Sequence, residues 1–262
     1  MPYVDFSMEG YDTDVGNPLG YSALQWFVDA DQVDTITDAG SGAVSEWKDL
    51  SPNANHLTQA TGASRPITGA NPLNGLNTID FDGTDDWMDA NDYSVNVSSR
   101  GVTWFAVFKW DATGTGKNAC YADRSGQAVA LNAHMVENNS GTYRVTYGTG
   151  ASPFAAGNYR EVSFPDPGTT LYKRYVGTVD TVNGPRLWIG GVPQTMTPLA
   201  GGTANPPNFL SSDSTPWKPH LGRRPDPFYF DGKIATWGFL STPLPIVEVG
   251  RLDSWLYRRW GV

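Results

Sequence analysis

Residues 231–262, DGKIATWGFLSTPLPIVEVGRLDSWLYRRWGV, change their hydrophobic pattern part-way along. The segment that ends at Leu240 is predicted to be the last strand of the chain. After Pro245, apolar residues recur every three or four positions, which indicates a helix. Proline is tolerated in a first helical turn, and Gly261 suits the end of the last one. We therefore expect a short C-terminal helix that plugs one end of a sandwich or packs against a sheet edge with its apolar stripe of Val249, Leu252, Leu256 and Trp260.

The clearest strand upstream is GVTWFAVFKWD, residues 101–111. Its residues alternate with a period of two, and one face is wholly apolar. The opposite face, which includes Phe105 and Val107, is also partly apolar. A strand that is buried on both faces belongs in the middle of a sheet, between a second sheet and a covering layer. The wholly apolar face consists of Val102, Trp104, Ala106, Phe108 and Trp110.

Short strand-like segments recur along the chain at roughly ten-residue spacing, which is typical of an antiparallel sandwich or barrel. The 29 glycines and 19 prolines suit the many tight turns that such a fold needs. Residues 195–219 are rich in Pro, Ser and Gly and are expected to form a long loop. No linker or internal repeat divides the chain, so we predict one domain over residues 22–262 after an N-terminal arm of residues 1–21.

The composition argues against several kinds of partner. The formal net charge is −9, and an acidic surface repels nucleic acids and anionic membranes. No apolar run approaches the roughly 18 residues that suggest a membrane-spanning helix, so no membrane insertion is expected. No signal peptide is expected either. The single cysteine, Cys120, cannot form an intrachain disulfide and is expected to be buried.

The arm of residues 1–21 mixes aromatic and acidic side chains. Such a segment can bury its aromatic residues at an interface while its acids meet a basic rim on a partner. We therefore predict that Tyr3, Phe6 and Tyr11 contact a partner, either another copy of the chain or a different protein. The alternative, in which this segment adds an edge strand to its own sheet, remains open.

Several stretches together resemble one superfamily: LQWFVDADQVDTITDAGSGAVSEWKDLSPNANHLTQATGASRPI, NPLNGLNTIDFDGTDDWM, VTWFAVFKW, RLWIGG and the closing strand and helix. They resemble the concanavalin A-like lectin/glucanase superfamily, in particular its laminin-G-like branch of bacterial and phage proteins. The resemblance covers about residues 22–262. It implies an all-β jelly-roll sandwich of two antiparallel sheets with a short C-terminal helix. It leaves function open, because this fold carries lectins, glycosidases, adhesion modules and virion proteins.

No catalytic residues are predicted. Glycosidases need two carboxylates beside the scissile bond, and the glucanases of the superfamily carry Glu-x-Asp-x-x-Glu on one strand. This chain lacks that pattern, although a pair drawn from different strands remains open. The histidines lack the spacing of zinc ligands. The glutamates are Glu9, Glu46, Glu137, Glu161 and Glu248, and the histidines are His56, His134 and His220.

Calcium is the one cofactor considered, since the resemblance implies a fold that often holds Ca²⁺ with loop carboxylates. Asp82, Asp85 and Asp86 in FDGTDDW are the candidate ligands, together with Asp12 and Asp14 in YDTDVGN. Oxygen-rich turns of this kind can bind Ca²⁺. Turn formation explains the same residues without a metal, and no cofactor is otherwise expected.

Carbohydrate binding combines an aromatic face with polar groups that meet sugar hydroxyls. We expect most tryptophans to lie in the core, and Trp87 and Trp217 to be exposed. Arg223, Arg224 and Asp226 follow Trp217 closely in sequence, and all five residues are candidate ligand-binding residues. In the alternative interpretation, Trp217 pins its own loop and the arginines pair with nearby aspartates.

The sequence leads to a first hypothesis of a non-enzymatic virion structural protein that displays a lectin-like domain. A phage capsid-decoration or tail-fibre component, made in the host cytoplasm, fits this description. Its expected partners are other virion proteins or further copies of itself, and surface glycans. The alternative is a bacterial carbohydrate-binding or adhesion module that reaches the outside by a non-classical route, and a glycoside hydrolase comes third. Gene neighbourhood and glycan-array binding would separate these hypotheses.

Overall fold

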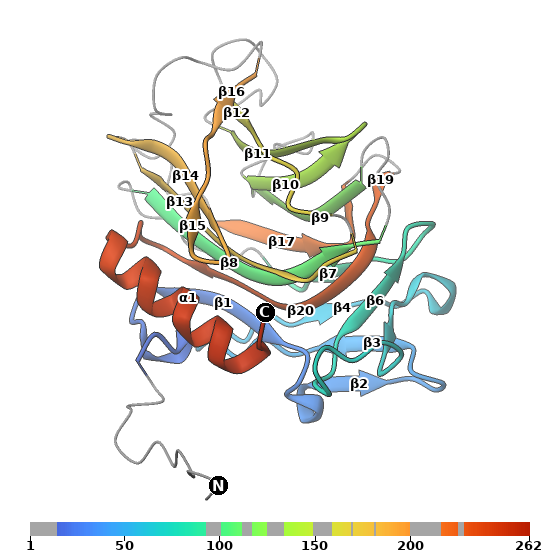
Figure 1. Cartoon of the computed structure of the whole chain (residues 1–262). Helices are drawn as coiled ribbons and strands as arrows, with labels where there is room; N and C mark the ends of the chain where they lie inside the picture. The colour runs from blue at the N-terminus through green and yellow to red at the C-terminus, as the bar shows by residue number, and fades with distance from the viewer. Residues whose placement is uncertain are drawn as a thin grey trace, which may run out of the picture.

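The described part of the protein is a sandwich of two antiparallel β-sheets with one α-helix, α1 (Ile246–Trp260), packed outside it (Figure 1). This computed structural model confirms the predicted all-β jelly-roll sandwich with a short C-terminal helix. No helix in the described part of the chain is long and apolar enough to span a membrane. The structure describes residues 15–92, 101–111, 117–124, 134–148, 159–168, 170–180, 182–199, 216–224 and 228–262.

We call the eight-stranded sheet, which α1 covers, sheet A. At its centre, β20 pairs with β8 on one side and with both β1 and β6 on the other. The strands of sheet A are β15 (Val192–Pro193), β14 (Gly184–Ile189), β13 (Lys173–Asp180), β8 (Gly101–Trp110), β20 (Asp231–Leu240), β6 (Ile79–Asp82), β5 (Ile67–Thr68) and β1 (Leu24–Asp29).

The ten-stranded sheet is sheet B. Its strands are, in spatial order, β16 (Thr197–Pro198), β12 (Tyr159–Phe164), β11 (Thr142–Gly148), β10 (His134–Asn139), β9 (Lys117–Arg124), β17 (Trp217–Leu221), β7 (Met88–Ala90), β4 (Leu57–Thr58), β3 (Val44–Trp47) and β2 (Ile36–Asp38). The remaining short elements are β18 (Arg223–Arg224), which pairs with β19 (Phe228–Tyr229), and the 3-10 turns η1 (Pro18–Gly20), η2 (Val33–Thr35) and η3 (Gly62–Ser64).

β8 is buried on both faces, as its sequence predicts. Trp104, Phe108 and Trp110 face sheet B and belong to the core between the sheets. Phe105 and Val107 face the other way and belong to a second apolar cluster, which includes residues of α1. The strand therefore lies between two separate apolar layers, because neither of its faces can be left in water at low cost.

Stacked aromatic rings fill the core between the sheets. The ring centroid of Phe108 lies 4.3 Å from that of Tyr175 and 5.1 Å from that of Trp237. The Trp237 ring also stacks on Trp104, with 5.7 Å between the two centroids. The close packing needs a glycine at position 177, where an added Cβ would lie 2.0 Å from Nε1 of Trp104. Aromatic pairs of this kind contribute stability beyond the area that they bury. Cys120 is buried as expected.

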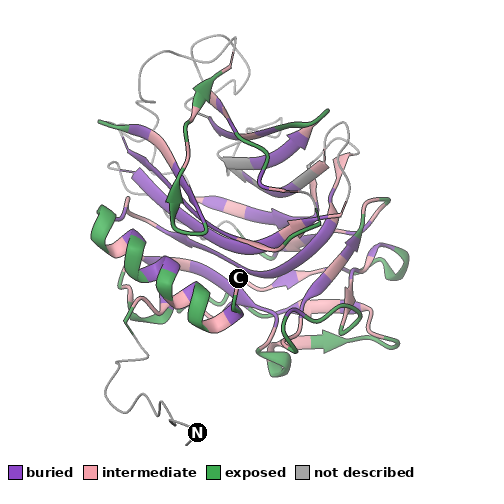
Figure 2. Cartoon of the chain, in the orientation of Figure 1, coloured by how far each residue is buried: buried purple, intermediate pink, exposed green. Residues whose placement is uncertain are grey.

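The helix lies across the outer face of sheet A and does not plug an end of the sandwich (Figure 1). The predicted stripe is correct, since all four of its residues are buried, but the predicted location is wrong. The physical reason is the second apolar face of the central strands, where residues such as Phe27, Phe105 and Ala235 need a cover. Figure 2 shows the buried side of α1 turned toward the sheet and its exposed side turned outward.

Ion pairs of two arginines, Arg174 and Arg259, connect α1 to sheet A and to the turn after β1. Arg174 of β13 binds the Asp253 carboxylate in a bidentate manner, with distances of 3.0 and 3.1 Å. Arg259 lies 3.2 Å from Asp29 and 2.9 Å from Asp31. Gly261 ends the helix in the left-handed conformation, with φ of 70°, which a glycine adopts at no steric cost. The helix is therefore fixed at its middle and at its C-terminal end.

The prediction that Trp217 is exposed in a long loop is wrong. Trp217 begins β17 and is fully buried in the core. A tryptophan that alternates with Pro219 and Leu221 on a paired strand is driven into the core by its large apolar area.

Tyr3, Phe6 and Tyr11 lie outside the described residues, so the prediction that they bind a partner stays a prediction.

Replacing Leu252 by alanine tests the role of α1 as the cover of sheet A. The side chain is fully buried against the sheet, so its truncation should lower the free energy of unfolding by about 2–5 kcal/mol in a urea titration. Ser254→Ala, on the exposed side of the same helix, should change it by less than about 0.5 kcal/mol. Equal effects of the two substitutions would contradict the packing described above.

Candidate ligand-binding surface

Trp87 and Asp89 project from the outer face of sheet B. The first and last residues of β7 face the core, and successive residues of a strand point to opposite faces. The Trp87 backbone is held on both sides, since its N–H donates to the Ser64 carbonyl (3.2 Å) and its own carbonyl accepts from Nε2 of Gln59 (3.0 Å). The indole is half-buried, so part of it is accessible from the solvent.

A guanidinium group stacks on this indole. The central carbon of the Arg223 guanidinium lies 3.3 Å from the Trp87 ring centroid, which is a close cation–π contact. The same guanidinium donates from Nη2 to the Asp89 carboxylate at 2.8 Å. His220 pairs in register with Asp89 across β17 and β7, and its Nδ1 lies 2.6 Å from the other carboxylate oxygen. We call Trp87, Asp89, His220 and Arg223 the Trp87 surface.

The Asp89 carboxylate is the electrostatic centre of the Trp87 surface. Burial raises the pKa of Asp89, but the hydrogen bonds and charges of His220 and Arg223 outweigh this effect and hold that pKa below its usual range. Asp89 is therefore ionised at neutral pH. It fixes the guanidinium above the indole from one side and the imidazole from the other.

The structure brings together two of the five predicted ligand-binding residues, Trp87 and Arg223. Trp217 lies in the core, and Asp226 lies outside the described residues, as does the side chain of Arg224. The sequence reasoning missed Asp89 and His220. Strand alternation in Trp-Met-Asp-Ala places Trp87 and Asp89 on one face, which is a usable signal. The pairing of His220 with Asp89 comes from a register across 131 residues, which no local pattern reveals.

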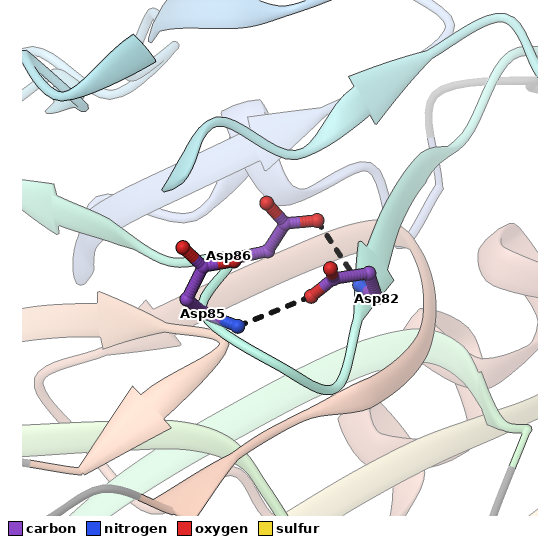
Figure 3. Close-up of side chains that lie close together, drawn as sticks. All are labelled: Asp82, Asp85 and Asp86. Atoms are coloured by element: carbon purple, nitrogen blue, oxygen red, sulfur yellow. Dashed lines mark hydrogen bonds between the residues drawn. The ribbon is translucent and has the colours of Figure 1, made fainter. Parts of the chain in front are cut away.

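The predicted metal ligands Asp82, Asp85 and Asp86 converge in the turn between β6 and β7 (Figure 3). One carboxylate oxygen from each lies within 4.8 Å of the others. Hydrogen bonds within the turn orient them: Asp82 accepts from the N–H of Asp85 (3.2 Å), and Asp86 accepts from the N–H of Asp82 (3.0 Å). Lys117 donates to the Gly83 carbonyl at 3.1 Å, so a cation already occupies one nearby oxygen.

Both interpretations of these aspartates fit this geometry. Clustered carboxylates suit a hard cation such as Ca²⁺, and the same hydrogen bonds are those by which aspartate stabilises a turn. Burial, together with the negative charges of Asp82, Asp85 and Asp80, raises the pKa of Asp86 to about 6. Asp12 and Asp14 lie outside the described residues. The calcium site therefore stays a prediction.

Asp86→Asn distinguishes the two interpretations of the acidic turn. A raised carboxyl pKa gives stability that is present below the unfolded pKa of about 3.9 and is lost as the pH rises through about 6. The variant cannot ionise and still accepts from Asp82, so without divalent cations it should melt at a higher temperature than the parent at pH 7.5. The two melting temperatures should converge near pH 4.

The calcium hypothesis adds a second expectation for the same pair of proteins. Millimolar CaCl₂ should raise the melting temperature of the parent at pH 7.5 and leave that of Asp86→Asn nearly unchanged, because a ligand that binds only the folded state stabilises it. Equal melting of the parent in CaCl₂ and in EDTA would contradict a calcium site in this turn.

Two glutamates from different strands do meet on the outer face of sheet B. Arg144 of β11 points away from the core and forms ion pairs with Glu137 of β10 and Glu161 of β12, the latter at 2.5 Å. Glu137 is fully buried. The pair that the sequence left open therefore exists in space, but one guanidinium holds both carboxylates.

A groove of about 550 Å³ lies on the α1 side of sheet A. Its charged lining includes Arg174, whose guanidinium is already bound to Asp253. The Trp87 surface instead combines a half-exposed indole with oriented polar groups, so we take it as the candidate site. The groove is lined by Leu73, Thr170, Leu171, Tyr172, Lys173, Arg174, Gly190 and Val262.

No protein-family model matches the chain, and no curated protein matches it either. Solved structures do. The chain is similar to Trypanosoma rangeli sialidase, with a TM-score of 0.58 and 12% identity over 92% of this chain and 34% of that one. It is similar to the ligand-binding domain of botulinum neurotoxin serotype D in complex with N-acetylneuraminic acid, with a TM-score of 0.57 and 9% identity over 88% of this chain and 50% of that one.

A third similar structure is the binding domain of Paraclostridial Mosquitocidal Protein 1, with a TM-score of 0.58 and 11% identity over 89% of this chain and 52% of that one. The chain thus spans about a third of the sialidase and about half of each toxin domain. Identities this low establish a shared β-sandwich fold and nothing finer.

Proposed function

We propose that this chain is a non-enzymatic, lectin-like domain of the concanavalin A-like, laminin-G-like type, and that it binds carbohydrate at the Trp87 surface. The observation that carries the proposal is the half-exposed Trp87 indole beside the Asp89, His220 and Arg223 side chains. The part of the indole that Arg223 leaves uncovered can offer an apolar surface to the C–H face of a sugar ring, and oriented polar groups can bind the sugar hydroxyls.

The similar structures support a binding role. One of the toxin domains is described with bound N-acetylneuraminic acid, and another is described as a binding domain. A fold alone does not determine a function, so the Trp87 surface is the main support for carbohydrate binding. The similarity supports the proposal that this β-sandwich carries a sugar site.

Trp87→Ala should abolish carbohydrate binding on a glycan array, because it removes the apolar plane while the strand beneath it remains paired. Tyr257→Ala is the matched control, since it removes an exposed aromatic ring from α1 on the other sheet. The control should bind as the parent does. A parent protein that binds no glycan, or a Trp87→Ala variant that binds normally, would contradict the proposed site.

We propose further that the chain hydrolyses no glycan. A glycosidase needs one carboxyl group that can give up a proton and a second that can reach the anomeric carbon or a water. Glu137 is fully buried, and the Arg144 guanidinium forms ion pairs with both carboxylates. Assays with laminarin, agar, carrageenan and peptidoglycan should show no turnover above a heat-denatured control. Turnover that Glu161→Gln removes would instead establish an enzyme.

The finer form of the proposal places the domain on a virus particle, as a phage capsid-decoration or tail-fibre component. The lectin-like fold and the net charge of −9 support this location, as does the absence of the superfamily's carboxylate motif. The alternative is a bacterial adhesion or carbohydrate-binding module. Mass spectrometry of purified particles should detect the chain as a stoichiometric component, and its consistent absence would favour the bacterial module.

A further inference from the structure

The Arg223 guanidinium that stacks on Trp87 is already paired with a carboxylate. Arg223 is paired with the Asp89 carboxylate at 2.8 Å, and Asp89 is ionised because its pKa lies below the usual range. A guanidinium that shares its charge with a carboxylate attracts a second carboxylate only weakly, since the two charges largely cancel beyond a few ångströms. The Trp87 surface therefore lacks a free positive charge from Arg223.

The neighbouring turn adds negative charge. Asp85 reaches Ser64, whose carbonyl accepts the N–H of Trp87, and the backbone of Asp86 packs against Gly222, the residue before Arg223. The acidic turn of Asp82, Asp85 and Asp86 thus borders the Trp87 surface directly. Charges that lie closer together than the Debye length, about 8 Å at physiological ionic strength, are only partly screened from one another.

We propose that the glycan recognised at the Trp87 surface is uncharged, and that Asp89 sets this selectivity by holding Arg223 in a neutral pair. This inference rests on the proposed carbohydrate binding and specifies its ligand class: oligosaccharides of neutral hexoses or N-acetylhexosamines, as opposed to sugars that carry a carboxylate. A carboxylate bound there would face the acidic turn, while the guanidinium on the indole is already paired with Asp89.

The first test uses the unmodified protein and a matched pair of probes, lactose and 3′-sialyllactose, in isothermal titration or on a glycan array that carries both. The protein should bind the neutral probe at least about tenfold more tightly than the sialylated one, since placing like charges side by side disfavours binding. Binding of the neutral probe should change little between 50 and 500 mM NaCl, because no ion pair is screened.

The second test frees the guanidinium. Asp89→Asn keeps an oxygen that can accept from Arg223 but removes the negative charge, so the affinity for 3′-sialyllactose should rise roughly tenfold relative to lactose, as expected for a new charge-assisted hydrogen bond. Asp31→Asn is the matched control, because it also removes one carboxylate charge beside an arginine, Arg259 of α1. It should leave the ratio of the affinities for 3′-sialyllactose and lactose unchanged. A thermal melt checks that both variants fold.

The outcomes separate the two proposals. Tighter binding of 3′-sialyllactose by the unmodified protein would overturn the neutral-ligand inference and leave carbohydrate binding standing. Binding of no glycan at all, neutral or acidic, would overturn both. An unchanged ratio in a folded Asp89→Asn variant would remove Asp89 as the determinant of selectivity. If that variant does not fold, the comparison of the two probes with the unmodified protein still decides the ligand class.

Discussion

The fold depends on the two-sided apolar character of the central strands of sheet A. β8 and β20 are buried along almost their whole length, so both of their faces must be kept from water. Sheet B covers one face through a stack of aromatic rings, and α1 covers the other with a four-residue apolar stripe. Burying one large apolar side chain contributes about 1.5–3 kcal/mol, so loss of either layer would expose more apolar surface than a domain of ordinary stability tolerates.

The same constraint determines where a ligand can bind. The only α-helix in the described part of the chain packs on sheet A, and sheet B turns its outer face away from both apolar clusters. That face carries charged and polar side chains: Arg144 with its two glutamates at one place, and Asp89 with His220 and Arg223 at another. The Trp87 indole lies beside Asp89 and Arg223, and Trp87 directly precedes β7. A polar face that carries a partly exposed indole suits recognition of a sugar better than it suits burial against a second apolar core.

Much of the fold follows from local sequence patterns. The alternation in β8 predicted a strand with two buried faces, and the spacing in residues 246–260 predicted the stripe of α1. The location of α1 could not be predicted, because a stripe reveals which side of a helix is buried but not what covers it. Trp217 was misassigned because its neighbours Pro216 and Pro219 suggested a loop, whereas pairing with β9 and β7 makes it a core residue. Two residues of the candidate site, Trp87 and Arg223, could be predicted from their residue types. The contacts that Asp89 makes with His220 and Arg223 could not, because they depend on strand register.

The most direct test of the account is the response of the ten tryptophan indole N–H signals to a bound glycan in an NMR titration. Of the ten, only Trp87 and Trp255 are half-buried, whereas the others are buried. Trp87 lies on the outer face of sheet B, and Trp255 belongs to α1, which covers sheet A. Saturation with a neutral oligosaccharide that the array identifies should shift the Trp87 signal strongly and leave Trp255 and the core signals in place. A shift of Trp255 with an unmoved Trp87 signal would contradict the assignment of the binding surface to sheet B.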